Sequence, residues 1–416
     1  MKTIAENLKI IKNSVNNIKN AILSKGGIIK SDITSYGEAV INLPSEGVVN
    51  PTASKNAVTF YDYDGSIRYS YTAEEFLALT EMPPLPIQKG LICQGWNSPL
   101  DEAQEYVSKY GILNIGTLYT TYDGKTRLYI RATVSGMDVP LYFTQTITHG
   151  VIVDWGDSSA TETLGGIGNV NTTHHYNSVG DYVISLDIVE GCRLGLGQSD
   201  VNIFGGAEKA SILKKLEIGD SADKLNKGAL SKCTSLSEIT LPSHISTSQT
   251  GGAYFHLNGC VSLKFVVVNS KISLFDSDFT GCTALSCVAL PAEKYGSISG
   301  FRGCTALESI IIPSRSSYIS SNAFQDCRSL KSIVLVSTIT SIQYLSFYGC
   351  TSMKFYDFSY HTKIPTLQDA TYAFSGISSD WKIIVPDALY DTWIAATNWS
   401  KYASYIIKKT DWDNQQ

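Results

Sequence analysis

Cysteine and histidine are the residues of this 416-residue chain best suited to nucleophilic, redox or metal chemistry, and there are nine and six of them. Six cysteines recur at intervals of 27, 22, 22, 23 and 23 residues: Cys233, Cys260, Cys282, Cys304, Cys327 and Cys350. Metal and redox motifs use Cys-x2-Cys pairs, whereas the closest two cysteines here, Cys282 and Cys287, are five residues apart. Spacing of roughly 20–29 residues is typical of a leucine-rich solenoid, in which like residues stack. We expect these thiols to fill the interior as small apolar groups, with disulfides or a metal as alternatives.

One histidine cluster remains as a possible metal or acid–base site. It consists of His149, His174 and His175 with Asp154 and Asp157. Its spacing matches neither the H-E-x-x-H pattern nor a zinc motif, so we expect His175 and Asp157 to form hydrogen bonds within turns. Phosphate-binding loops, nucleophile elbows and an acid pair for glycan hydrolysis are not evident either. The sequence predicts no enzymatic activity, no cofactor and no metal.

Composition excludes further classes. Thirty-three basic against 38 acidic residues give a net charge of −5, which argues against nucleic-acid binding. No apolar run approaches the length that spans a bilayer, so we expect no membrane insertion. Residues 1–14 lack the continuous apolar segment of a signal peptide.

The elements that position the cysteines follow from the apolar residues around them. Counted from each cysteine, apolar side chains recur at +3, +6 and +8, as at Leu285, Val288 and Leu290. This L-x-x-L-x-L pattern predicts a short strand with inward side chains at +6 and +8. A second internal row lies three residues before most cysteines, at Phe279, Phe301, Phe324 and Phe347. The pattern extends from residue 210 to residue 385, which predicts about eight turns with atypical ends.

The phrase AFQDCRSLKSIVL at 323–335 resembles the BspA-type (Treponema-like) leucine-rich repeat. The segment 385–406, VPDALYDTWIAATNWSKYASYI, resembles the helical cap that closes such arrays in gut bacteria and their phages. The resemblance implies a binding or scaffold surface rather than a particular ligand.

Positions +5 and +7 point away from the interior, and in the middle of the array they are apolar. Exposed apolar patches mark contacts, which predicts a binding face. Its candidate residues are Phe265, Val267, Ile311, Val334 and Phe355. Alternatively, another domain or the C-terminal helix covers this face, or strand propensity alone selected the residues.

The first 25 residues carry a heptad pattern that ends at Gly26 and Gly27. Its seam consists of Ile4, Leu8, Ile11, Val15, Ile18 and Ile22. β-Branched residues at the d positions favour a homo-oligomer, preferably a trimer; the alternative is an amphipathic helix packed on its own domain. The segments 11–27 and 31–43 also resemble the opening of tail and tail-fibre proteins of gut phages.

Two modules are expected between the helix and the repeats. Pro83, Pro84 and Pro86, followed by Gly90 and Trp96, resemble the β-grasp-like internalin B-repeat, with Trp96 in its core. A helix is expected to follow, with Ser98 as N-cap, Pro99 as first residue and Gly111 as stop. The segments 153–157 (VDWGD) and 180–183 (GDYV) resemble a PKD-type, immunoglobulin-like β-sandwich with Trp155 in its core.

The expected organisation is a mostly β, multidomain string. It comprises an N-terminal helix and linker (1–47), a β-grasp-like module (48–118), a PKD/Ig-like sandwich (119–200), a leucine-rich-repeat solenoid (201–386) and a helical cap (387–416), with the sandwiches as spacers. We expect an attachment protein, foremost a phage tail fibre or receptor-binding protein of the virion, made in the host cytoplasm. The alternative is a BspA-like adhesin at the surface of a gut bacterium or secreted from it. Either would bind a cell-surface protein or glycan.

Overall fold

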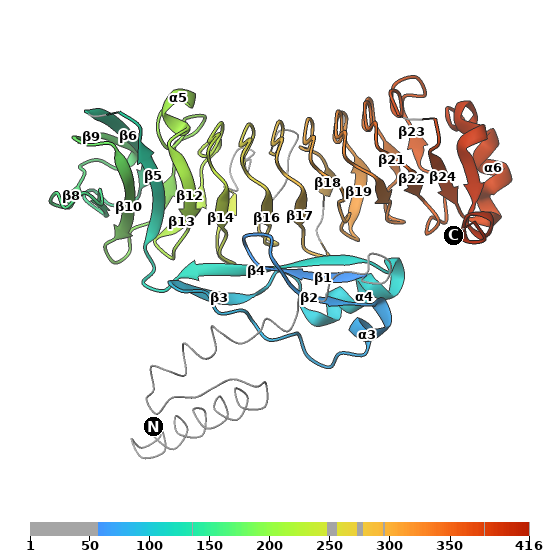
Figure 1. Ribbon diagram of the computed structural model, residues 1–416, viewed down its shortest axis with the longest axis horizontal. Helices are drawn as coiled ribbons and strands as arrows, with labels where there is room; N and C mark the ends of the chain where they lie inside the picture. Colours follow the sequence, from blue (N-terminus) through green and yellow to red (C-terminus); the bar gives the residue numbers. More distant parts are fainter. Residues whose placement is uncertain are drawn as a thin grey trace, which may run out of the picture. The chain divides into compact units, whose positions relative to one another are not determined.

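The computed structural model describes residues 57–134, 136–247, 256–272, 278–293, 296–377 and 379–415. The chain divides after Ser54, and all described residues belong to the second unit, Lys55–Gln416. This unit is mostly β, and its C-terminal part is a solenoid of about eight turns, as the repeats predict (Figure 1).

Residues 57–122, hereafter the N-terminal module, form a four-stranded sheet of order β2-β1-β4-β3 with two helices. Its elements are β1 (Val58–Tyr61), β2 (Ile67–Tyr71), α3 (Ala73–Leu77), β3 (Leu91–Trp96), α4 (Leu100–Tyr110) and β4 (Leu113–Thr121). Phe60 is fully buried and meets the Trp96 ring edge-on, with centroids 4.8 Å apart, which agrees with a core role for Trp96. Gly111 ends α4 in a left-handed conformation, as expected. At the N-terminus of α4 the structure differs from the expectation, because Pro99 rather than Ser98 is the N-cap. The Ser98 hydroxyl instead accepts a hydrogen bond from the Ala292 amide of the solenoid.

Residues 126–196 form two layers of strands. The strands are β5 (Thr126–Ala132), β6 (Met137–Gln145), β7 (Val151–Asp154), β8 (Glu162–Thr163), β9 (Gly168–Tyr176), β10 (Gly180–Ile188) and β11 (Leu194–Leu196). Trp155 is buried between the layers, as predicted. Both layers continue into the solenoid, because β5 pairs with β12 (Leu213–Glu217) and β11 pairs with β13 (Ala222–Leu225). This region therefore forms the first end of the solenoid, and the expectation of a separate spacer is not met.

The solenoid has two faces of short parallel strands. The front face, at positions +5 to +7, comprises β12, β14 (Glu238–Thr240), β16 (Phe265–Val267), β17 (Cys287–Ala289), β20 (Ser332–Val334), β22 (Phe355–Asp357) and β24 (Lys382–Val385). The back face comprises β13, β15 (Ser246–Thr247), β18 (Gly296–Ile298), β19 (Ser316–Ile319), β21 (Ser341–Ile342) and β23 (Thr366–Leu367). A one-turn helix, α5 (Ala207–Ala210), precedes β12.

The interior is packed as the repeat pattern predicts. Leu285, Val288 and Leu290 are buried, and so are their counterparts one turn later. The second internal row is a continuous stack of phenylalanine rings: Phe279–Phe301, Phe301–Phe324, Phe324–Phe347 and Phe347–Phe374, with centroids 5.1, 5.5, 5.4 and 5.7 Å apart. Such offset stacks add to the free energy of apolar burial.

The far end of the solenoid is closed by residues 387–413. They form η1 (Asp387–Leu389), α6 (Tyr390–Ala395), η2 (Trp399–Tyr405), β25 (Ile406–Lys408) and α7 (Lys409–Asp413). The predicted cap is thus only partly helical, since β25 extends the front face by pairing with β24. Trp399 is buried and donates its ring N–H to the Pro365 carbonyl, which satisfies a backbone group next to β23.

Candidate functional site

The six repeated cysteines are buried and reduced, which agrees with the structural interpretation of their spacing. Each thiol from the second onward also donates to a backbone carbonyl of the preceding turn. The Sγ–O distances are 3.2 Å for Cys260–Leu230, 3.1 Å for Cys282–Leu257, 3.1 Å for Cys304–Phe279, 3.0 Å for Cys327–Phe301 and 3.2 Å for Cys350–Phe324. The position therefore requires a small side chain that also donates a hydrogen bond, which the apolar-filler argument missed.

Burial keeps these thiols protonated. It raises the pKa of Cys233, Cys282 and Cys327 to about 12 and that of Cys260 and Cys304 well above the usual range. Thiolates are the nucleophiles and metal ligands of cysteine chemistry, so this row is chemically inert at neutral pH. Among the described residues, no three His, Cys, Asp or Glu side chains are grouped so that they could hold a metal ion.

A row of left-handed backbone positions runs directly before the cysteine row. Glycine occupies it in most turns, at Gly259, Gly281, Gly303, Gly349 and Gly376, with φ of 73–78°. Successive members nearly touch: a Cβ on Gly376 would lie 3.4 Å from the Gly349 Cα. Two turns carry side chains instead, at Lys232 (φ 59°) and Asp326 (φ 60°), where a non-glycine residue costs about 1 kcal/mol or more. The recurring Gly-Cys pair is visible in the sequence and is the signal that could have revealed this row.

Two residues of the predicted binding face, Phe265 and Val267, are not exposed. They are 5 % and 4 % exposed and pack with Leu118 of β4. The Tyr61 ring lies 5.1 Å from the Phe265 ring between centroids. Gly116 allows this approach, because a Cβ there would come within 2.4 Å of Val267. The prediction of a free binding surface is therefore wrong at these positions, and the alternative that another domain covers them is correct.

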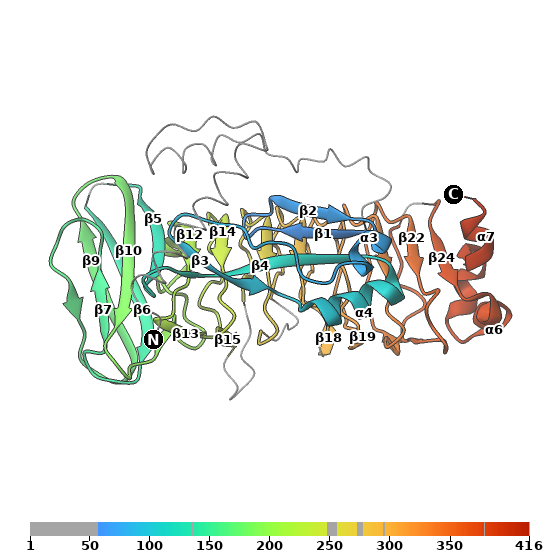
Figure 2. The ribbon, with the colours of Figure 1, turned by 90° about the horizontal axis from the view of Figure 1, so that it is seen from below.

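Polar contacts extend this cover along the solenoid. The Asn97 side-chain amide donates to the carbonyls of Val268 and Ala289, at 3.2 and 3.0 Å. Further on, the Tyr106 hydroxyl of α4 donates to the Ile312 carbonyl at 2.7 Å. Figure 2 shows β4 and α4 lying across the solenoid strands. The N-terminal module is thus docked on the front face through satisfied backbone groups.

The other three predicted residues are partly buried. Ile311 and Val334 pack against the main core. Phe355 contacts Trp412 of α7, with ring centroids 5.2 Å apart. The C-terminal helix therefore contributes to covering this face, as the second alternative proposed.

The histidine cluster separates into two surface pairs. His174 lies 2.7 Å from Asp157 and stacks on the Trp155 ring, whereas His175 lies 2.8 Å from Asp138 on the neighbouring strand. Asp157 accepts the Ser159 amide within its turn, as expected, whereas His175 bonds across a strand pair rather than within a turn. The seam residues Ile4, Leu8, Ile11, Val15, Ile18 and Ile22 lie outside the described residues.

Large exposed side chains occur instead on other parts of the last turns. Tyr318 of β19, Tyr344 and Tyr372, hereafter the tyrosine row, are 36, 47 and 45 % exposed. They belong to successive turns, and the rings of Tyr344 and Tyr372 meet edge-on at 6.0 Å. The adjacent back face carries hydroxyl groups, with the Thr340 hydroxyl donating to the Ser317 carbonyl. The repeat motif gave no sign of this row, because the three tyrosines occupy different positions relative to the cysteines.

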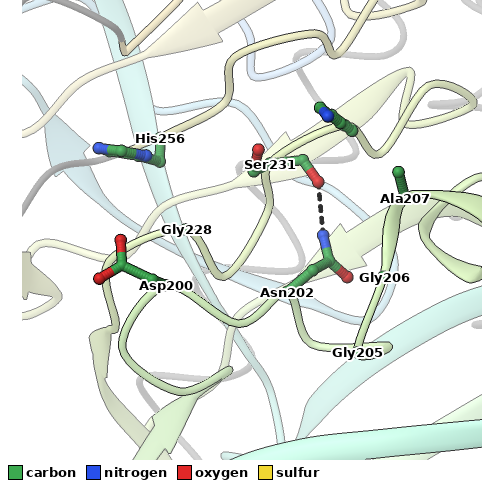
Figure 3. Close-up of a pocket in the computed structure, with 9 residues that line it drawn as sticks. Asp200, Asn202, Gly205, Gly206, Ala207, Gly228, Ser231 and His256 are labelled. Carbon is green, nitrogen blue, oxygen red and sulfur yellow. Dashed lines mark hydrogen bonds between the residues drawn. The ribbon is translucent and has the colours of Figure 1, made fainter.

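A small polar cavity of about 220 Å³ lies where residues 200–207 meet the next two turns. Its lining comprises Asp200, Asn202, Gly205, Gly206, Ala207, Gly228, Ser231, Lys232 and His256 (Figure 3). The Asn202 side chain donates to the Ser231 carbonyl at 2.6 Å and thereby ties two walls together.

Comparison with known proteins identifies the repeats. Residues 208–300 and 294–392 match the model of the BspA type leucine rich repeat region, in six copies. No curated protein matches the sequence. In no described segment is there a helix with the length and hydrophobicity needed to span a membrane.

Three similar solved structures share only part of their length with this chain. A leucine-rich repeat protein from Bacteroides ovatus ATCC 8483 is 20 % identical over 51 % of this chain and 61 % of its own, with a TM-score of 0.32. One from Eubacterium ventriosum ATCC 27560 is 21 % identical over 39 % and 42 %, with a TM-score of 0.31. A leucine rich cell surface protein from Faecalibacterium prausnitzii A2-165 is 20 % identical over 42 % and 60 %, with a TM-score of 0.23. The chain therefore spans less than two thirds of each of these proteins.

Proposed function

From the BspA-type leucine-rich repeats that the chain carries in residues 208–392, we propose a non-enzymatic attachment protein that binds a cell-surface protein or glycan through its solenoid. The observation that carries the proposal is the tyrosine row. Tyrosine is enriched at protein interfaces, because its ring offers a large rigid contact area and its hydroxyl a hydrogen bond. Tyr344 and Tyr372, whose rings meet edge-on, and Tyr318 one turn earlier are exposed outside the covered front face.

The test compares two kinds of exposed tyrosine. The full chain is labelled and its binding to panels of bacterial and epithelial cells is measured by flow cytometry. We expect the double variant Tyr344→Ala, Tyr372→Ala to weaken binding at least about tenfold, as loss of central aromatic contacts does. The control is Tyr122→Ala, which removes a still more exposed tyrosine (65 %) next to β4 and should leave binding unchanged.

Two results would contradict the proposal: no binding of the unmodified chain to any cell, or equal binding by the double variant. Thermal unfolding of all three proteins shows whether the substitutions leave the solenoid intact.

Of the two settings, we favour a bacterial surface adhesin, which the BspA-type match supports. The phage tail-fibre hypothesis depends mainly on residues 1–43, which lie outside the described part of the chain. Antibody labelling of intact bacteria and of phage particles from the same culture separates the two. Label on virions alone would overturn the adhesin assignment.

We further infer that residues 119–200 are a PKD-like sandwich and residues 48–118 a β-grasp-like module, as their motifs suggest. Two layers of strands around the buried Trp155 support the first, and the mixed sheet beside α4 supports the second. In the attachment protein both would brace the solenoid, through β5–β12 pairing and through the docked β4.

A further inference from the structure

One wall of the polar cavity, at residues 200–206, is held by hydrogen bonds and close packing. Asn202 is 8 % exposed, and its side-chain oxygen accepts the Phe204 amide while its nitrogen binds Ser231. Gly205 has a positive φ of 77°, and a Cβ there would lie 2.5 Å from the Tyr142 ring, so this loop has one close-packed arrangement. At the neighbouring Gly206 a Cβ would meet no atom within 4 Å, which marks the open side of the cavity. A ligand here would meet a surface that needs little reorganisation.

Two side chains lining the cavity belong to residues with a positive φ, a backbone conformation that favours glycine. Lys232 occupies the left-handed position that glycine holds in the three following turns, at Gly259, Gly281 and Gly303. His256, with φ of 39°, precedes its cysteine by four residues, a position that Gly300 holds in one later turn and Asp278, Ala323 and Ser346 hold in others. Glycine is the unstrained residue at both places. The strained side chains therefore add chemistry to this part of the solenoid that the fold does not require.

Two charged side chains line the cavity, Asp200 and Lys232, and the Asp278 carboxylate accepts the backbone amide of His256. Asp200 is paired with Lys227 at 2.7 Å, whereas Lys232 has no carboxylate partner among the described residues. Burial, reinforced by the nearby Lys227, lowers the pKa of His256, so its ring is neutral at pH 7. A neutral imidazole donates one hydrogen bond and accepts another, which suits a hydroxyl group.

In Figure 3, Asp200 and His256 lie on the left, and Asn202, Gly206 and Ala207 lie on the right. The volume of about 220 Å³ is below the roughly 300–1,000 Å³ of pockets for drug-sized ligands. A ligand of a single ring is therefore the appropriate size. It needs hydroxyl groups for His256 and the Asp200 carboxylate and an anionic group for Lys232.

We propose that this cavity is a binding site for one acidic sugar ring, such as a uronic acid, with its carboxylate on Lys232 and its hydroxyls on His256 and Asp200. The site is separate from the tyrosine row at residues 318–372, so either can fail without the other. It would let the solenoid recognise an acidic residue of a surface polysaccharide in addition to the contacts of the tyrosine row.

The test is calorimetric titration of the full chain with D-glucuronate. D-Glucose is the control for the sugar ring without a charge, and acetate is the control for a carboxylate without the ring. We expect glucuronate to bind to the unmodified chain. Lys232→Gly should lower the affinity for glucuronate at least about tenfold, because a hydrogen bond to a charged group is lost. His256→Gly should weaken glucuronate and leave the affinity for acetate unchanged. Both variants place glycine where it is unstrained, so they should fold.

The matched control for Lys232→Gly is Asp326→Gly, the same backbone position on another turn. Like Lys232→Gly, this substitution relieves a strained backbone position and should raise the free energy of unfolding, but it should leave glucuronate binding unchanged. No binding of glucuronate, binding of acetate with equal affinity, or equal weakening by Asp326→Gly would each overturn the proposal. Equal binding of glucose would show a neutral-sugar site and contradict the role of Lys232.

Discussion

At the scale of single residues, the cysteine row shows how a repeat selects a side chain. Each thiol from Cys260 onward fills a narrow buried space and donates to a carbonyl of the preceding turn. Alanine would fill most of the space but remove this second hydrogen bond, since the same carbonyl also accepts a backbone N–H of its own turn, as the Phe279 carbonyl does from Cys282. A net hydrogen bond contributes about 0.5–1.5 kcal/mol.

The two roles of the thiol can be separated at Cys304. We expect Cys304→Ala to lower the free energy of unfolding by about 1 kcal/mol, the net contribution of one hydrogen bond, and Cys304→Ser to lower it less, because serine keeps a donor toward the Phe279 carbonyl. Urea unfolding measures both. A larger loss for serine than for alanine would show that apolar filling alone selects cysteine.

Burial of the row also predicts a dependence of stability on pH. An unfolded thiol titrates near 9.0, whereas the folded pKa of Cys282 is about 12. Between these values the unfolded chain loses protons that the folded chain keeps, so stability is complete below pH 9 and falls as the pH rises. Each such thiol should contribute a slope of about 1.4 kcal/mol per pH unit. Urea midpoints from pH 8 to 11 test this, and an equal slope in Cys282→Ala would contradict it.

At the scale of elements, the decisive contact is that of β4 with β16 and β17. Positions +5 and +7 of these two strands can be apolar because Leu118 and Tyr61 cover them. Gly116 makes the approach possible, and the polar contacts of Asn97 and Tyr106 fix its register along the solenoid.

Gly116→Ala should loosen this contact, because the added Cβ would overlap Val267 and overpacking costs about 1–3 kcal/mol. The labelling rate of the Cys287 thiol measures how closed this contact is, because its sulfur lies under the N-terminal module, 3.5 Å from the Asn114 side-chain nitrogen. In a Cys93→Ser background we expect faster labelling of Cys287 by a thiol reagent. Gly206→Ala is the matched control, because its backbone is extended and its Cβ meets open space.

At the scale of the whole molecule, residues 126–413 form one solenoid with strands at both ends, and the separate sheet of the N-terminal module is docked on its side. The strands of residues 126–196 extend both faces of the solenoid, and β25 extends the front face at the other end. Both ends of the repeat array are thus closed by strands or helices that satisfy its terminal backbone groups, which limits edge-to-edge association.

Association of whole chains is predicted to depend on the heptad seam from Ile4 to Ile22. We expect light scattering to give a trimer mass for the full chain and a monomer mass after deletion of residues 1–27, because the seam would be the main self-contact. The double variant Leu8→Asp, Val15→Asp is the control that keeps the length. Equal monomer masses for all three proteins would remove the prediction.

The sequence alone determined the repeat, its eight turns, the buried cysteine and phenylalanine rows and the absence of known catalytic motifs. These follow from local periodicity, because each turn packs on its neighbours in the same way. Only the tertiary structure decided which outward residues are free. Phe265 and Val267 are buried by a module about 150 residues earlier in the chain, whereas Tyr344 and Tyr372 stay exposed. A repeat pattern describes what points inward and outward, but it contains no information about what else in the chain folds back onto the outside.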